Sequence, residues 1–240
     1  MTLRRYVVSV LRSLVAGLLC LSVLASHNRL SAQVGYPPDH SPYSDVARGV
    51  NAILSAGYLT GDRGEVPVGP SDGPMITLRF ERPLSRVMAI TLETSYAQTT
   101  RYLVDPADSA KYRYSQLVDE PLFLLDVGLM LRLTGAKAWH HFAPYFGMTG
   151  GAAISVSPPP DPSGYEFKAR PMFGPSLGLR WYWTSGFSVR IDTRVRFWQV
   201  KYPLTFKQLS PDGTRILDLD ADDTDWTTHP GVTVGLGWTF

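Results

Sequence analysis

The sequence has 240 residues, of which 44% are apolar and 18% charged. This composition is too apolar for a disordered chain and too evenly mixed for a bundle of membrane helices. The first 32 residues hold four arginines and no acid, so the rest has 23 − 4 = 19 basic and 21 acidic residues, a net charge of −2. No excess positive charge remains to bind a polyanion, and we expect no nucleic-acid partner. The 21 glycines, 19 prolines and 12% aromatic residues favour strands joined by turns.

Residues 1–32 predict a secretory signal peptide. Three arginines, Arg4, Arg5 and Arg12, precede the apolar run Ser13–Ala25, which is shorter than the roughly twenty residues of a membrane-spanning helix. We expect cleavage after Ala32, with Ala25 as the alternative. The only cysteine, Cys20, lies inside the apolar run, so the mature chain would have no disulfide and no thiolate metal site.

Residues 33–45 are expected to form a short lead without a regular period, and residues 46–240 a single domain. In this domain apolar side chains alternate with polar or small ones, as in Ile76, Leu78 and Phe80. A period of two predicts strands with two different faces, and no long stretch has a helical period. We expect eight strands, near Arg48–Thr60 and at Ile76–Glu81, Met88–Tyr96, Phe123–Leu133, Tyr145–Val156, Phe173–Trp183, Phe187–Phe197 and Val232–Phe240.

The connections between these strands differ in length. The expected long ones are Gly61–Gly73, Thr100–Asp119, Ser157–Lys168 and Tyr202–Asp225, whereas Pro83–Ser85 and Thr184–Gly186 are short and Thr134–Phe142 is intermediate. Short turns at one end and long loops at the other are typical of an up-and-down transmembrane β-barrel, with its turns on the periplasmic side.

The lengths of the strands and their residue types favour a bilayer over water around this barrel. Several stretches alternate for ten residues or more, which is enough to cross a membrane when tilted. Aromatic residues such as Tyr96, Trp181 and Trp198 lie near strand ends, as in the girdles at membrane interfaces. The alternative is a soluble eight-stranded barrel with a ligand cavity, in which the apolar face would point inward.

The chain also resembles a known class of proteins. The segment Gly231–Phe240 alternates strictly and ends on an aromatic residue, similar to the C-terminal signal that the outer-membrane barrel assembly machinery reads. The stretch Phe173–Trp198 and the run Ala143–Gly147 resemble the small eight-stranded outer-membrane β-barrel superfamily, which includes porin-family domains. The resemblance implies an exported outer-membrane protein of a Gram-negative-type cell, with membrane lipid, lipopolysaccharide and the assembly machinery as partners. The residues that would carry the assembly signal on the lipid side are Val232, Val234, Leu236, Trp238 and Phe240.

Some members of that superfamily modify lipid A, which requires a histidine placed beside a serine or an acid. His140 and His141 lie in a predicted periplasmic turn, and His40 lies in the lead. His229, at the expected start of the last strand and near Asp225, is the one candidate near the outer rim. We expect no enzyme and no catalytic residue.

The longest loop contains an acidic run, Asp218, Asp220, Asp222, Asp223 and Asp225. Carboxylates are the ligands that Ca²⁺ or Mg²⁺ prefers, but the spacing lacks the glycine and closing glutamate of an EF-hand. We therefore expect a solvated loop, no metal and no cofactor.

Charged residues recur on the less apolar face of several strands, including Arg79 and Glu81. The lumen of an eight-stranded barrel has room for little beyond its own side chains, so we expect opposite charges to pair there. The main expectation is a non-enzymatic structural or surface-interaction barrel, expected to be a monomer; the alternative is a narrow channel or a transporter of small solutes or small apolar molecules. The predicted lumen charge network comprises Glu93, Asp126, Arg132, Arg180, Arg190, Asp192, Arg194 and Arg196.

Overall fold

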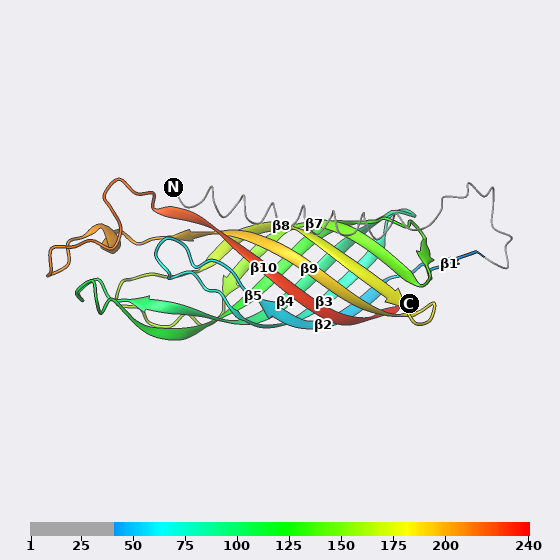
Figure 1. Cartoon of the computed structure of the whole chain (residues 1–240), viewed down its shortest axis with the longest axis horizontal. Coiled ribbons are helices and arrows are strands. Elements are labelled where there is room, and N and C mark those ends of the chain that lie inside the picture. Colours follow the sequence, from blue (N-terminus) through cyan, green and yellow to red (C-terminus); the bar gives the residue numbers. More distant parts are fainter. Residues whose placement is uncertain (1–40) are drawn as a thin grey trace, which may run out of the picture. The chain divides into compact units, whose positions relative to one another are not determined.

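The computed structural model describes residues 41–240, and in this range the chain is built from β-strands (Figure 1). The expected signal peptide and most of the expected lead lie outside the described residues. A 3₁₀ turn, η2, spans Leu204–Lys207. The strands are β1 (Tyr43–Asp45), β2 (Asn51–Leu59), β3 (Gly73–Pro83), β4 (Met88–Val104), β5 (Tyr114–Arg132), β6 (Lys137–Trp139), β7 (Phe142–Ser155), β8 (Ala169–Tyr182), β9 (Phe187–Lys201) and β10 (Thr224–Thr239).

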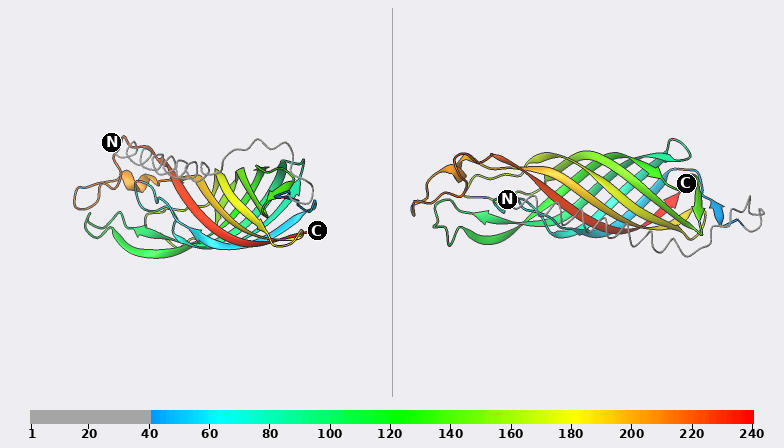
Figure 2. Two further views of the ribbon diagram at one scale, coloured as in Figure 1. Left: turned by 45° about the vertical axis from the view of Figure 1, so that its right-hand side comes forward. Right: turned by 45° about the horizontal axis from the view of Figure 1, so that its top comes forward.

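Eight of these strands form a closed antiparallel ring in chain order, β2-β3-β4-β5-β7-β8-β9-β10. The ring closes where β10 pairs with β2, from Gly231↔Leu59 to Thr239↔Asn51. Figure 2 shows the tilted strands of this ring from two further sides. The predicted eight-stranded up-and-down barrel is therefore confirmed, and closure pairs the backbone groups that an open sheet would leave at its edges.

Two expectations about the strands were wrong in detail. The long loop expected at Thr100–Asp119 is mostly sheet, because β4 and β5 stay paired from Thr100↔Asp119 outward to Val104↔Tyr114. The end of the expected lead is also a strand, since β1 pairs with the short strand β6 in the connection between β5 and β7. Both corrections lengthen the sheet at the ends of the barrel and leave its topology unchanged.

The two faces of the wall have different chemistry. Along β3, buried and exposed residues alternate for ten positions. The outward positions are apolar, for example Leu78, Leu92 and Leu125, whose exposed fractions are 39%, 49% and 42%. The inward positions carry polar, charged or small side chains. The apolar face thus points outward, the opposite of the arrangement in a soluble barrel.

Among residues 41–240 there is no helix that is long and apolar enough to span a membrane.

The interior is divided along the barrel. We call the end with the connections 84–87 and 183–186 the turn end, and the other the loop end. The middle of the interior is charged, whereas the loop end holds an apolar cluster to which strands and loops both contribute. Three loops supply Val66 and Val68, Tyr165 and Phe167, and Phe206 and Leu217, which pack against inward strand residues such as Leu122, Met172 and Trp198. We call these loop residues and their strand partners the apolar plug. The expectation that Trp198 belongs to an aromatic girdle on the outer face was therefore wrong, because its side chain is fully buried inside the barrel.

A glycine in β8 makes room for a buried tyrosine. A Cβ atom added at Gly178 would lie 2.1 Å from the Tyr145 hydroxyl oxygen and 2.3 Å from its ring carbon Cζ. Tyr145 cannot move aside freely, because it is buried and its hydroxyl donates to Asp192 and accepts from Arg190 Nη2 at 2.5 Å.

We predict that Gly178→Ala destabilises the barrel by about 1–3 kcal/mol, because it overpacks a site with no free volume. The measurement is the temperature or urea concentration at which the SDS-resistant folded band is lost. Gly150→Ala in β7 is the matched control, since its nearest atom would lie at an ordinary 3.8 Å. Equal stability of the two variants would contradict the tight fit of Tyr145.

Candidate functional site

The most elaborate side-chain arrangement in the described chain is an ion-pair network in the middle of the lumen. Glu93 on β4 lies at its centre. Its carboxylate accepts hydrogen bonds from Arg79 Nε, from Arg194 Nη1 and Nη2 at 2.7 and 3.0 Å, and from Arg196 Nη2 at 3.1 Å. One carboxylate from one side of the barrel thus holds three guanidinium groups from β3 and β9.

A second group of contacts lies closer to the turn end. Glu81 on β3 accepts from Arg180 Nη2 at 2.5 Å and from Arg190 Nη1 at 2.6 Å. Arg190 also binds Asp192 through Nε at 2.5 Å. The Tyr145 hydroxyl donates to Asp192, which joins β7 to the same group. Arg79 Nη1 lies 3.5 Å from Asp192 Oδ1 and so links the two groups.

The network is close to electrically neutral. Its five arginines and four carboxylates sum to 5 − 4 = +1, and each of them is at most 5% exposed. A cavity of about 10 Å³ remains beside Arg79, Glu93 and Asp192, which is room for about one water molecule. The network comprises Arg79, Glu81, Glu93, Asp126, Arg180, Arg190, Asp192, Arg194 and Arg196.

The structure brings together seven of the eight charges that the sequence predicted for the lumen. The exception is Arg132, at the turn end of β5, which is half-buried and makes no ion pair within residues 41–240. Arg79 and Glu81, which the sequence places on the less apolar face of β3, also belong to the network. The part of Tyr145, which lies opposite Gly178 and donates to Asp192, was not predicted from the sequence.

Arginine and acidic residues also fasten the loops at the mouth. Arg101, at the loop end of β4, is fully buried and donates to Glu120 on β5. Its Nη1 donates to Asp161 Oδ2 in the loop 156–168 at 2.5 Å. Arg113 reaches from the loop 105–113 to Ser210 Oγ at 3.0 Å in the loop 202–223. The loops are therefore tied to the wall and to one another.

His229 does not lie at an accessible rim. Its ring stacks on Trp198 with centroids 3.6 Å apart, and its Nε2 lies 2.8 Å from Thr227 Oγ1. The residue is fully buried inside the barrel. The last strand, β10, begins at Thr224, so His229 is its sixth residue and does not lie at its start. His140 and His141 lie in the connection at the turn end, as the sequence predicted.

The acidic run at 218–225 is dispersed. Asp223 pairs with Lys207 at 2.7 Å, and Asp225 accepts from the Glu65 backbone N–H at 3.0 Å. Within residues 41–240 there is no group of three or more His, Cys, Asp or Glu side chains arranged to hold a metal ion. Asp223 therefore makes a contact within the loop 202–223, and Asp225, on β10, binds the loop that contains Glu65. The five residues proposed for the assembly signal, Val232, Val234, Leu236, Trp238 and Phe240, all lie on the outer face with at least half of their surface exposed.

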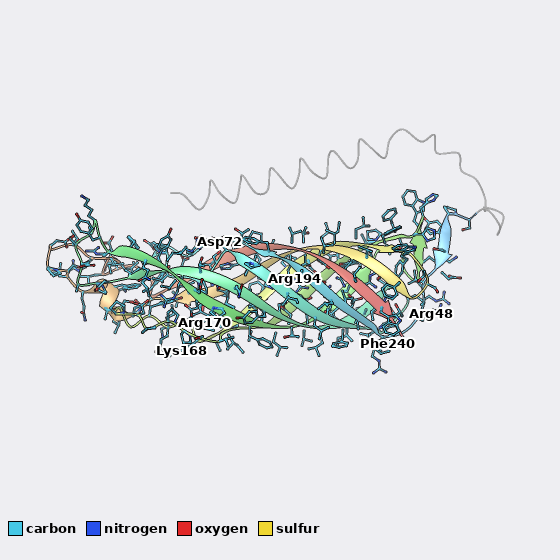
Figure 3. All side chains as sticks on the ribbon, turned by 90° about the horizontal axis from the view of Figure 1, so that it is seen from below. Arg48, Asp72, Lys168, Arg170, Arg194 and Phe240 are labelled. Carbon is cyan, nitrogen blue, oxygen red and sulfur yellow. The ribbon has the colours of Figure 1, made fainter. Side chains whose placement is uncertain are left out.

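A pocket of about 290 Å³ lies at the loop end, where β8 begins and β9 ends. It is lined by two tyrosines and by charged residues of both signs. Figure 3 shows Lys168 and Arg170 beside each other on this side of the barrel, far from Arg48 and Phe240 at the turn end. The lining side chains that carry charge are Glu166, Lys168, Arg170 and Lys201.

No protein-family model and no curated protein matches the sequence. Among solved structures, the chain is similar to Neisserial surface protein A, with 10% identity over 83% of this chain and 98% of that one and a TM-score of 0.47. It is also similar to the outer membrane protein OprG from Pseudomonas aeruginosa, with 12% identity over 82% and 98% of the two chains and a TM-score of 0.46. The N-terminal β-barrel domain of Pseudomonas aeruginosa OprF shares 13% identity over 78% and 98%, with a TM-score of 0.39.

Because these sequence identities and TM-scores are low, the assignment of the chain as a barrel rests on the strand pairing within residues 41–240.

We predict that Glu93→Gln destabilises the barrel by about 3–5 kcal/mol, because removing one partner of a buried ionic group leaves the other charges uncompensated. Chemical unfolding followed by tryptophan fluorescence measures the change. Glu166→Gln is the control, because Glu166 pairs with Lys168 on the exposed surface and such pairs contribute at most about 1 kcal/mol. A loss at Glu93 no larger than that of the control would show that the network is not a stabilising unit.

Proposed function

We propose that this protein is an exported outer-membrane barrel that acts, without catalysis, as a closed scaffold for a surface made of its four loops. The observation that carries the proposal is the filled interior: the ion-pair network occupies the middle of the lumen and the apolar plug occupies the loop end. A barrel of this kind holds its loops in place but offers no continuous path for a solute.

The outer face supports the membrane location. It presents aliphatic side chains along the strands, as on β4 and β5, whereas water would favour polar groups there. Aromatic side chains gather toward the ends of this face, for example Trp226 near the loop end and Trp238 near the turn end. Membrane lipid and lipopolysaccharide are the expected surroundings of such a surface.

The connected loops support a role in surface interaction. Arg101 and Arg113 tie three of the loops to the wall or to each other, and the apolar plug includes side chains from three loops. Loops held in this way present a preorganised surface, which lowers the ordering cost of binding a partner. Catalysis at His229 would require a substrate to reach a ring that is stacked on Trp198 and fully buried.

We expect the purified protein to shift its apparent size on boiling in SDS gels and to produce no stepwise current in planar bilayers. The physical reason is that ion passage would require several buried arginine–carboxylate contacts to open together. A wide porin recorded in the same bilayers is the control. Salt-dependent single-channel steps from the folded protein would support the transport alternative and overturn the closed scaffold.

We predict that His229→Ala leaves the lipid A profile of a producing strain unchanged while lowering the stability of the barrel, because the stack on Trp198 is lost. Mass spectrometry of lipid A and thermal loss of the folded band measure the two effects. His141→Ala, an exposed histidine at the turn end, is the control for stability. A change in lipid A acylation that depends on His229 would contradict the non-enzymatic role.

A further inference from the structure

The barrel wall has a weak seam between β8 and β9. Their pairing ends at Met172↔Trp198, although β8 begins at Ala169 and β9 continues to Lys201. Beyond that point β8 remains paired only with β7 and β9 only with β10. The two strands therefore separate at the loop end of the barrel, and the 290 Å³ pocket lies where they part.

Two prolines weaken this pairing: Pro171 lies where the pairing ends, and Pro175 lies at an interruption between Phe173↔Phe197 and Ser176↔Arg194. The carbonyl of Leu177 faces β9, because it accepts from Thr193 Oγ1 at 3.2 Å, whereas that of Gly174 faces β7, because it accepts from Thr149 Oγ1 at 3.4 Å. Positions two apart along a strand face the same neighbour. The nitrogens of Pro171 and Pro175 therefore face β9, and neither can donate a hydrogen bond to it.

The pocket carries excess positive charge. Lys168, Arg170 and Lys201 line it together with one acid, Glu166, which sums to 3 − 1 = +2. Glu166 pairs with Lys168 at 3.0 Å. Arg170 and Lys201 make no ion pair among the described residues, so two cations at the pocket lack a counterion.

Buried donors also lack partners at this pocket. Tyr165 is one of the lining residues and is only 1% exposed, and its buried hydroxyl oxygen has no hydrogen-bond partner in the described part of the chain. The same is true of Arg170 Nε. A buried hydroxyl without a hydrogen-bond partner is energetically unfavourable, so a ligand that accepts a bond from it would be favoured. Burial raises the pKa of Tyr165, so its hydroxyl keeps its proton and can donate it in a hydrogen bond.

Aromatic rings mark the height of the pocket relative to the membrane. On the outer face, Phe173 contacts Phe197 and Trp226, with centroids 5.5 and 5.6 Å apart. Such clusters lie at the boundary between hydrocarbon and headgroups. Arg170 is three residues further toward the loop end, which is about 10 Å along a strand. If the barrel spans the outer membrane as proposed, the pocket lies level with the lipid headgroups.

We propose that this pocket binds the phosphate group of an outer-leaflet lipid, with Arg170, Lys201 and the Tyr165 hydroxyl as its donors. The lipid would approach from the side, through the gap between β8 and β9, because its acyl chains stay in the bilayer. The inference rests on the proposed membrane location and extends it by naming a ligand and a site.

The test uses the full folded protein in zwitterionic detergent. Three probes are titrated: lipid A carrying both phosphates, the same lipid after enzymatic dephosphorylation, and inorganic phosphate. Binding is followed by native mass spectrometry or by thermophoresis. We expect the phosphorylated lipid to bind at least tenfold more tightly than either of the other two.

Two variants probe the donors. Arg170→Gln with Lys201→Gln is expected to weaken binding of the phosphorylated lipid at least tenfold. Its control is Lys111→Gln with Lys137→Gln, which removes the same charge from two residues that do not line the pocket, one in the loop 105–113 and one at the turn end. Tyr165→Phe is expected to weaken binding severalfold without lowering stability, because its hydroxyl has no partner to lose.

The outcomes separate this proposal from the preceding one. Equal binding of phosphorylated and dephosphorylated lipid, or equal effects of the two double variants, would overturn the phosphate site. Equally tight binding of inorganic phosphate would overturn the lipid as its source. Either result can occur in a protein that is heat-modifiable and non-conducting, so the closed scaffold would still stand, whereas channel activity would overturn the scaffold whatever the pocket binds.

Discussion

Pairing between arginines and carboxylates inside a narrow ring is the constraint on which the other features of this barrel depend. The apolar face is directed outward, so the inward face must carry the polar side chains, and eight strands enclose little space for water around them. Each charge must then find its partner across the lumen. Glu93 does so with three arginines from two strands, and this contact connects opposite sides of the wall.

At the loop end the interior is filled by apolar side chains instead of charged ones. There the inward strand residues are apolar, and side chains from three loops cover them. These three loops are consequently part of the folded core of the barrel. The place where this closure is least complete is the β8–β9 seam, where Pro171 and Pro175 remove donors from the ladder. The pocket that we propose as a lipid site is found there.

The sequence alone predicted the strand number, the up-and-down order and the direction of the faces, because a period of two is a local property of the chain. It also placed most of the network, since Arg190, Asp192 and Arg194 follow one parity on one strand. It did not predict partners such as Glu81 with Arg180, because that contact depends on the stagger between strands far apart in the chain. The pocket was also missed, since Tyr165 and Lys201 come from a loop and a strand end without periodicity.

Because Val66, Phe167 and Phe206 pack in one cluster, the outward surface of the loops is a composite of segments far apart in the chain. An antibody or receptor that recognises it reads a discontinuous epitope, which exists only while the barrel is folded. Peptides that copy single loops would lack the arrangement that the shared core imposes. A residue inserted into one loop would displace the neighbouring loops that pack in the same cluster. The packing inside the barrel therefore limits which sequence changes the outer surface can accept.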